Sequence, residues 1–136
     1  MQFPDKYNCL IKNEFVSGNY KIVPIRYKDR LAIMNWRNEQ MYHLRQVEPL
    51  TERYQDEYFN EIVAKIFDQE KPNQLLFSFL KNEKLIGYGG LVHINWKDKN
   101  AEISFIMHTK LEEKFFQLHW SNFLKLIEIL AFEELD

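Results

Sequence analysis

Three side chains that could exchange a proton with a substrate lie on two stretches whose sequences predict β-strands. Glu102 and His108 belong to segment 101–108, whose alternating pattern places both on one face. His93 belongs to the glycine-containing segment 85–96 and could share a cleft with them. A carboxylate or an imidazole placed in this way could act as a general acid or base. Alternatively, Glu102 is a strand carboxylate that faces solvent or a Lys or Arg partner. His108 would then be a surface histidine at a strand end, and His93 a half-buried strand histidine.

Other residues are candidates for binding rather than for proton transfer. The guanidinium of Arg37, between Trp36 and Asn38, forms a fork that suits the two oxygens of a carboxylate or phosphate. Tyr88 and the following pair Gly89-Gly90 could shape a binding site, although a simple β-bulge would explain the glycines equally well. Alternatively, Arg37 caps carbonyls at a helix end and Trp36 lies in the core.

Several other kinds of chemistry are excluded by what the chain lacks. Cys9 is the single cysteine, so neither an intrachain disulfide nor a thiolate zinc cluster can form. The sequence has no His-x-x-x-His pair, EF-hand loop, phosphate-binding Gly-Lys-Ser/Thr or Gly-x-Ser-x-Gly elbow. We therefore expect no metal site, and we interpret Cys9 as a small buried thiol rather than a nucleophile.

The composition predicts one globular domain over residues 1–136. Hydrophobic residues make up 46% and charged residues 28%, which argues against a disordered chain. The net charge of −2 argues against a nucleic-acid partner, because such a protein needs a basic face. No apolar run approaches the roughly 20 residues of a membrane helix, and residues 1–7 do not resemble a secretory signal. We therefore expect a cytoplasmic protein without a membrane partner.

The residues that could do chemistry must be positioned by a set of alternating and periodic segments. Two strands are expected within 8–26, joined by a turn containing Gly18, and Pro24 indicates an edge position or a bulge there. A helix follows the candidate N-cap Asp29, and a second helix from Thr51 ends near Glu70. Two apolar rows run along this second helix: Tyr54, Tyr58, Ile62, Ile66 in one row and Phe59, Val63, Phe67 in the other.

The second half of the chain predicts a meander followed by a helix. Three strands are expected at 74–80, 85–96 and 101–108, separated by polar turns. The helix runs from about Glu113 to the end, with an apolar stripe at Phe116, Trp120, Phe123, Ile127 and Leu130. The order β-β-α-α-β-β-β-α predicts an α+β fold with a mixed, largely antiparallel sheet flanked by helices.

Four stretches, in this order and spacing, then point to a known family. They are the segment 20–25 with the helix ending in Trp36-Arg37-Asn38, the helix from Thr51, the strand 85–91 and the strand 101–107. Together they resemble the GNAT superfamily of acetyl-CoA-dependent N-acetyltransferases. The Trp-Arg-Asn sequence resembles the branch that acetylates bacterial amino sugars or the N-termini of ribosomal proteins. The resemblance covers about residues 20–136.

This resemblance implies acetyl-CoA as the cosubstrate and a small-molecule or peptide amine as the acceptor. Glu102 would take the proton of the acceptor amine, and His108 would be the second catalytic candidate. The acetyl group would be held by the backbone of Phe105, Ile106 and Met107, although these could also be plain core residues. The acceptor site would be lined by Trp36, Arg37, Tyr88 and His93.

The sequence departs from the family in two respects. The family's pyrophosphate signature, Arg/Gln-x-x-Gly-x-Gly/Ala, corresponds to the stretch 113–122, which has no glycine. The resemblance then assigns the pyrophosphate to Lys114, Gln117 and Asn122, and His119 could add a charge there. The family also continues with a fifth strand, a fourth helix and a closing hairpin beyond Asp136. We therefore expect a fold that is incomplete at its C-terminus, which a second copy of the chain could complete as a homodimer.

Three hypotheses remain open at this point. The first is an N-acetyltransferase of the GNAT type. The second is a non-catalytic module of the same fold that has lost the phosphate loop and binds a partner or dimerises. The third is an unrelated α+β binding domain.

Overall fold

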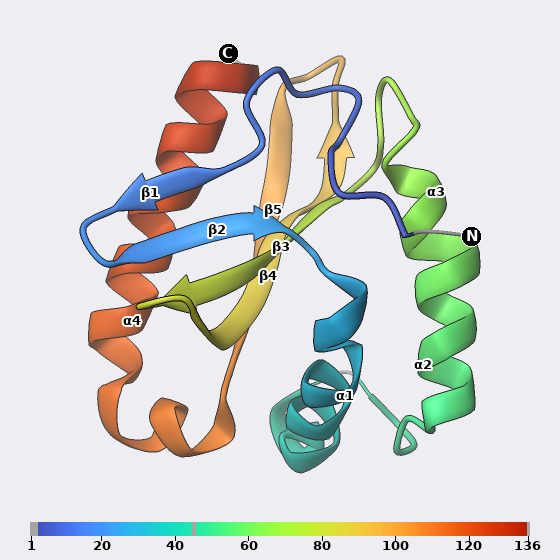
Figure 1. The fold of residues 1–136 in the computed structure, drawn as a ribbon, viewed down its shortest axis with the longest axis vertical. Helices are drawn as coiled ribbons and strands as arrows, with labels where there is room; N and C mark the ends of the chain where they lie inside the picture. Colours follow the sequence, from blue (N-terminus) through green and yellow to red (C-terminus); the bar gives the residue numbers. More distant parts are fainter. Residues whose placement is uncertain (1–2, 45, 136) are drawn as a thin grey trace.

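The computed structural model describes residues 3–44 and 46–135, and it is built around one five-stranded sheet (Figure 1). The strands follow one another in the order β1-β2-β3-β4-β5, and each neighbouring pair is antiparallel. Their bounds are β1 Phe15–Ser17, β2 Tyr20–Pro24, β3 Leu75–Lys81, β4 Lys84–Asn95 and β5 Asn100–Met107. The expected α+β fold is confirmed, and the described sheet contains antiparallel pairs only.

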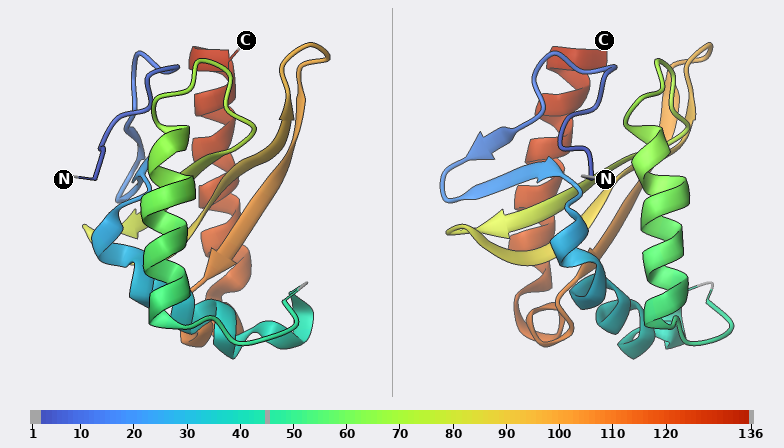
Figure 2. Two further views of the ribbon diagram at one scale, coloured as in Figure 1. Left: turned by 90° about the vertical axis from the view of Figure 1, so that its right-hand side faces the viewer. Right: turned by 45° about the vertical axis from the view of Figure 1, so that its right-hand side comes forward.

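Helices cover both faces of this sheet. On one side lie α1 (Arg30–Glu39) and the long helix formed by α2 (Glu52–Tyr58), the π-helical segment η3 (Phe59–Val63) and α3 (Ala64–Ile66). On the other side lies α4 (Thr109–Leu130), which continues into the π-helical segment η4 (Ala131–Leu135). Figure 2 shows the sheet between these two layers. Short 3-10 turns flank α1 at Tyr27–Asp29 (η1) and Met41–His43 (η2).

The core between the sheet and α4 is aromatic. Phe123 of α4 lies against Phe79 and Phe105, with ring centroids 5.2 and 4.6 Å apart. The stripe expected on this helix is buried at Phe123, Ile127 and Leu130, whereas Phe116 is exposed at the opposite end. Each fully buried side chain of this size stabilises the fold by about 1.5–3 kcal/mol.

The long helix of the other layer buries one of its two expected apolar rows fully and the other only at its C-terminal end. Thr51 caps it as predicted, because its hydroxyl accepts a hydrogen bond from the Tyr54 backbone N–H at 3.1 Å. Phe59, with Val63 and Phe67 of the same row, is buried. In the other row Tyr54 and Ile62 are exposed, whereas Ile66 is buried. The π-helical segment explains the difference, since its wider turn rotates the following residues relative to those before it.

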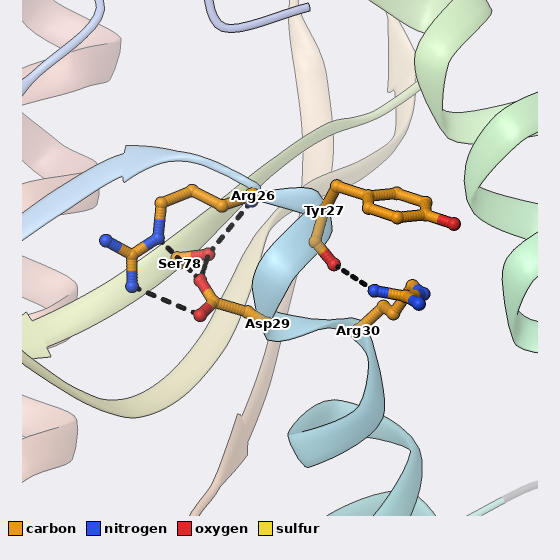
Figure 3. Close-up of polar contacts among 5 residues, drawn as sticks. All are labelled: Arg26, Tyr27, Asp29, Arg30 and Ser78. Carbon is orange, nitrogen blue, oxygen red and sulfur yellow. Dashed lines mark hydrogen bonds and ion pairs between the residues drawn. The ribbon is translucent and has the colours of Figure 1, made fainter. Parts of the chain in front are cut away.

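The junction between β2 and α1 is held by a buried ionic network (Figure 3). Asp29 occupies the N-cap position of α1, but its side chain does not cap the helix as expected. Its carboxylate instead accepts hydrogen bonds from Arg26 Nε at 2.7 Å and Nη2 at 3.1 Å, and from Ser78 Oγ at 2.8 Å. Ser78 Oγ in turn accepts the Arg26 backbone N–H at 3.2 Å. This network fixes the start of α1 against β3.

The N-terminal segment forms less strand than expected. The first strand is limited to Phe15–Ser17, and residues 8–14 lie outside the sheet. Instead, the buried Tyr7 stacks on Phe67 at 4.1 Å between ring centroids. Its hydroxyl donates to the Leu76 carbonyl at 2.6 Å and accepts from the Leu76 N–H at 3.0 Å. These contacts tie the segment to β3 and to the long helix.

Candidate functional site

A cavity of about 270 Å³ lies between α1, α2 and the sheet. Three tyrosines, an arginine and several smaller polar groups contribute to its lining: Arg37, Tyr54, Tyr58, Gln74, Tyr88 and Ser104. Tyr88 and Val92 of β4 pair with Ile106 and Glu102 of β5, and Gly90 between them pairs with Ser104, so these positions share one face of the sheet. That face is the floor of the cavity.

Arg37 and Tyr88, which were both predicted to bind the acceptor, are in contact inside this cavity. Arg37 Nη1 donates a hydrogen bond to the Tyr88 hydroxyl at 2.9 Å. Burial raises the pKa of Tyr88, and the nearby Arg37 charge only partly opposes this rise. Tyr88 is therefore a neutral phenol at physiological pH and leaves the charge of Arg37 uncompensated.

The neighbours of Arg37 position the walls of the cavity. Trp36 is buried and packs against the ring of His108, with ring centroids 5.5 Å apart. Asn38 clamps the loop before α2, because its side chain accepts the Leu50 N–H at 2.7 Å and donates to the Leu50 carbonyl at 3.0 Å. Gln46 bridges the two, donating to Asn38 Oδ1 at 2.9 Å and accepting from Arg37 Nε at 3.3 Å. Neither Gln46 nor the clamping role of Asn38 was predicted from the sequence.

The paired glycines of β4 mark a close approach of backbones rather than a bulge. Gly89 and Gly90 pair in regular register with Phe77 and Leu76. A Cβ atom on Gly89 would lie 2.1 Å from the Ser104 carbonyl oxygen, and one on Gly90 would lie 1.9 Å from that of Leu75. The register shifts of β4 lie elsewhere, one of them between Val92 and Asn95.

The second register shift brings two of the predicted site residues together. His93 has a positive φ of 50° within this bulge. Its Nδ1 lies 2.9 Å from Glu102 Oε2, so the imidazole and the carboxylate form a hydrogen-bonded pair. Both side chains are more than 70% exposed, at 74% and 71%. Neither lines the cavity, but Ser104, the next residue on the same face as Glu102, does.

The remaining catalytic candidate, His108, lies at the other end of β5. Five residues of strand, 103–107, lie between it and Glu102, and these six steps of extended chain correspond to about 20 Å. His108 is the N-cap of α4, and its Nδ1 accepts the Lys110 N–H at 3.2 Å. The structure therefore brings Glu102 to His93 and not to His108.

The predicted acetyl-binding residues lie on an edge strand. β5 pairs with β4 on one side and with no other strand of the described sheet. Phe105 faces α4, whereas Ile106 and Met107 are buried. The Met107 carbonyl accepts a hydrogen bond at 2.7 Å from the side chain of Gln40, a buried residue that the sequence analysis did not identify.

The predicted pyrophosphate residues surround a break in α4. Phe115 has the non-helical angles φ −125° and ψ 25°. A hollow of about 350 Å³ at this break is lined by residues 112–118, which include Lys114 and Gln117. It also includes two carboxylates, Glu112 and Glu113. Asn122 lies further along the helix, where its side chain donates to the Leu118 carbonyl at 2.8 Å.

His119 contributes no positive charge to this region. Its side chain is buried, and Nδ1 lies 3.0 Å from the Tyr20 hydroxyl of β2. Burial lowers the pKa of His119, and the charge of Lys81 lowers it further. The neutral imidazole therefore anchors α4 to the sheet.

Other features of the described residues bear on function only indirectly. No described helix combines the length and apolar character needed to cross a membrane. No group of three or more His, Cys, Asp or Glu side chains in the described residues is arranged to hold a metal ion. Cys9 is half-buried and unpaired, and burial raises the pKa of its thiol, which disfavours the reactive thiolate.

Comparison with known proteins agrees with the sequence resemblance. The family model described as Acetyltransferase (GNAT) domain matches residues 22–135. A crystal structure provisionally named an acetyltransferase matches with a TM-score of 0.65 and 13% identity, over 92% of this chain and 61% of its own. The ribosomal-protein-S5-alanine acetyltransferase of Vibrio fischeri matches with a TM-score of 0.55 and 14% identity, over 88% of this chain and 68% of its own. A search of curated proteins found no match.

Proposed function

The chain belongs to the acetyltransferase (GNAT) domain family, and we propose that it transfers an acetyl group from acetyl-CoA to a primary amine. The acceptor would be an amino sugar or the N-terminus of a protein or peptide. The observation that carries this proposal is the polar cavity on the α1 and α2 side of the sheet, which is floored by β5 at Ser104. Ser104 brings the cavity next to β5, the strand that the resemblance assigns to the acetyl group, which supports this proposal.

On the acceptor side, we propose that Glu102 receives the proton that the amine must lose. The amine nitrogen would form a bond to the acetyl carbonyl carbon and the carbon–sulfur bond would break. The coenzyme A thiolate would take up a proton from solvent, to which Glu102 would release the proton it had received from the amine. His93 supports this role because its hydrogen bond holds the Glu102 carboxylate in place at 2.9 Å. His108, which caps α4 and packs on Trp36, would position the end of β5.

On the cosubstrate side, the residues present fit acetyl-CoA in part. The backbone of Phe105 to Met107 lies on the open edge of the sheet, where it can accompany an extended ligand. The hollow at Phe115 supplies Lys114 and Gln117, together with the first turn of the helix that restarts after the break. The negative charges of Glu112 and Glu113 would repel a pyrophosphate there. Attraction by the backbone N–H groups and by Lys114 must therefore exceed this repulsion. Acetyl-CoA supplies the activated thioester, and the chain supplies its orientation.

We also propose the setting in which this reaction occurs. Residues 1–136 would form a single domain, and the protein would act in the cytoplasm on a small-molecule or peptide amine. One core that joins the N-terminal segment, the sheet and the helices supports a single domain. The net charge of −2 supports a substrate other than nucleic acid.

Replacement of Glu102 tests the proposed proton transfer. Glu102→Gln should lower turnover by about 10²-fold or more, as loss of a general base does, while acetyl-CoA affinity remains unchanged. Steady-state kinetics and calorimetric titration measure the two quantities. Glu83→Gln is a matched control, because Glu83 is equally exposed at 73% and also has one ionic partner, Lys21 at 2.7 Å. Unchanged turnover in the Glu102 variant would remove this residue from the mechanism.

A second candidate function, a non-catalytic module that dimerises, is favoured by the surface next to β5. An apolar hollow of about 430 Å³ lies between β4, β5 and the C-terminal part of α4, beside the exposed Ile103 and Phe132. An open strand edge next to such a surface suits a second copy of the chain. Sedimentation equilibrium would then show a dimer, and the chain would not bind acetyl-CoA. Detectable acetyl transfer by this chain would rule out the non-catalytic module.

A further inference from the structure

Arg37 is a half-buried cation for which the protein provides no counter-ion. None of the ion pairs in the described part of the chain involves Arg37. No acidic side chain lines the cavity, and the other lining residues are apolar or neutral. Its partner Tyr88 remains a neutral phenol, because burial raises the pKa of that hydroxyl. Removing a charge from water without a partner is costly, so the cavity favours a ligand that carries negative charge.

The hydrogen-bond donors of the cavity point to the same class of ligand. A guanidinium has five N–H groups, and Arg37 uses one on Gln46 at 3.3 Å and one on Tyr88 at 2.9 Å. The other N–H groups, on Nη1 and Nη2, have no protein acceptor among the described residues. One N–H from each nitrogen forms the fork that binds two oxygens of a carboxylate or phosphate.

The rest of the lining can complete such a site. Three hydroxyls border the cavity without a hydrogen-bond partner among the described residues: Tyr54, Tyr58 and Ser104. Hydroxyl groups can donate to oxyanions without adding charge. The clamp from Asn38 to the Leu50 backbone holds the loop that closes the site, which favours a preformed pocket.

We propose that the acceptor amine carries a second, anionic group, a carboxylate or a phosphate, which binds to the free edge of Arg37. This inference rests on the proposed function, since it concerns the acceptor of that same reaction. It restricts the acceptor class to amines such as amino acids, peptide segments with an acidic group or amino sugar phosphates. Neutral amines of the same size would leave Arg37 without its partner and would bind more weakly.

Matched pairs of small amines test this proposal by direct binding. The first pair is propylamine and β-alanine, and the second is ethanolamine and phosphoethanolamine; within each pair one member carries the extra anion. Calorimetric titration of the full chain without acetyl-CoA should show at least tenfold tighter binding of one anionic member. The pair with the larger ratio identifies carboxylate or phosphate as the preferred group. Equal affinities within both pairs, or no binding of any probe at about 10 mM, would overturn the proposal.

Three variants connect this preference to Arg37. Arg37→Gln should reduce the ratio within the pair to about one, and Arg37→Lys should retain part of it, because a lysine keeps the charge but loses the fork. Arg53→Gln is the matched control, since Arg53 of α2 is 90% exposed and has Glu57 as its partner. A ratio that persists in Arg37→Gln would overturn the assignment. If that variant fails to fold, the comparison within each pair on the unchanged chain still decides.

Binding and acetylation of these amines, measured separately, distinguish failure of the anion site from failure of the proposed acetyl transfer. Preferential binding of the anionic amine without acetyl transfer would leave the Arg37 site in place and contradict the acetyltransferase proposal. Acetylation of propylamine and β-alanine with equal kcat/KM would confirm the transferase and overturn the anion site. Acetylation with a kcat/KM that falls at least tenfold without the anionic group would support both.

Discussion

At the residue scale, the polar side chains of this molecule divide into those that hold the fold and those left open to a ligand. Arg26, Asp29 and Ser78 satisfy one another and leave no donor of Ser78 free. Arg37 satisfies only part of its guanidinium within the protein. The first set should control stability, and the second should control binding.

Asp29 should be one of the most sensitive polar residues for stability. Asp29→Ala removes three charge-assisted hydrogen bonds and leaves Arg26 and the buried Ser78 without their acceptor. We expect the free energy of unfolding to fall by about 2–3 kcal/mol, measured by urea denaturation. Asp5→Ala, at an exposed position, should change it by less than about 0.5 kcal/mol. Similar values for the two variants would show that the network is not a stability determinant.

His119 should make the fold less stable in mild acid. Its folded-state pKa is lowered by burial and by Lys81, so it lies below the unfolded value of about 6.5. Its contribution to stability is therefore complete above pH 6.5 or so and is lost as the pH falls through the lowered pKa. Urea midpoints at a series of pH values should decline less steeply in His119→Gln than in the unchanged chain. Parallel curves of urea midpoint against pH for the two proteins would exclude His119 as the source of the loss of stability in mild acid.

The sequence predicted some site residues and could not have predicted others. Arg37 was predicted as a binding residue because its guanidinium fork suits the two oxygens of an anion, and the structure places it in contact with Tyr88 in one cavity. The positioning roles of Gln40, Asn38 and Gln46 were not predicted. The sequence does not show whether an amide side chain lies on the surface or in a hydrogen-bond network inside the protein. Only the fold shows that Gln40 is buried against the Met107 carbonyl.

At the element scale, the strands of the meander were predicted to within one or two residues. Polar turns delimit 75–81, 84–95 and 100–107; β3 is a short apolar run because both of its faces are buried, whereas β5 alternates. The start of α4 at Thr109 was missed, since the helical break at Phe115 hides the first turn from a periodic pattern. The π-helical segment likewise altered which row of the long helix is buried.

The contact between β4 and β5 should tolerate no side chain at Gly89. A Cβ atom there would lie 2.1 Å from the Ser104 carbonyl oxygen, so Gly89→Ala must push β5 away from β4. We expect a loss of about 2–3 kcal/mol in the free energy of unfolding, together with weaker binding in the adjacent cavity. Gly18→Ala is the control, because that turn has open space and should lose only about 1 kcal/mol. Equal losses would contradict this account of the strand contact.

At the scale of the whole molecule, the sheet separates two sites. The cavity proposed for the acceptor lies on the α1 and α2 face, and the hollow proposed for the pyrophosphate lies at the break in α4, the helix of the other layer. β5 lies at the edge next to both, so a thioester held along it could meet an amine from the cavity. The chain spans 61% of the first structural neighbour's length.

The most direct test of the central claim is calorimetric titration of this chain with acetyl-CoA. The account predicts saturable binding that free coenzyme A competes for and that Lys114→Gln weakens, since Lys114 is the cation of the pyrophosphate hollow. Absence of binding at about 1 mM acetyl-CoA would contradict the assignment of β5 and the α4 break as a cosubstrate site.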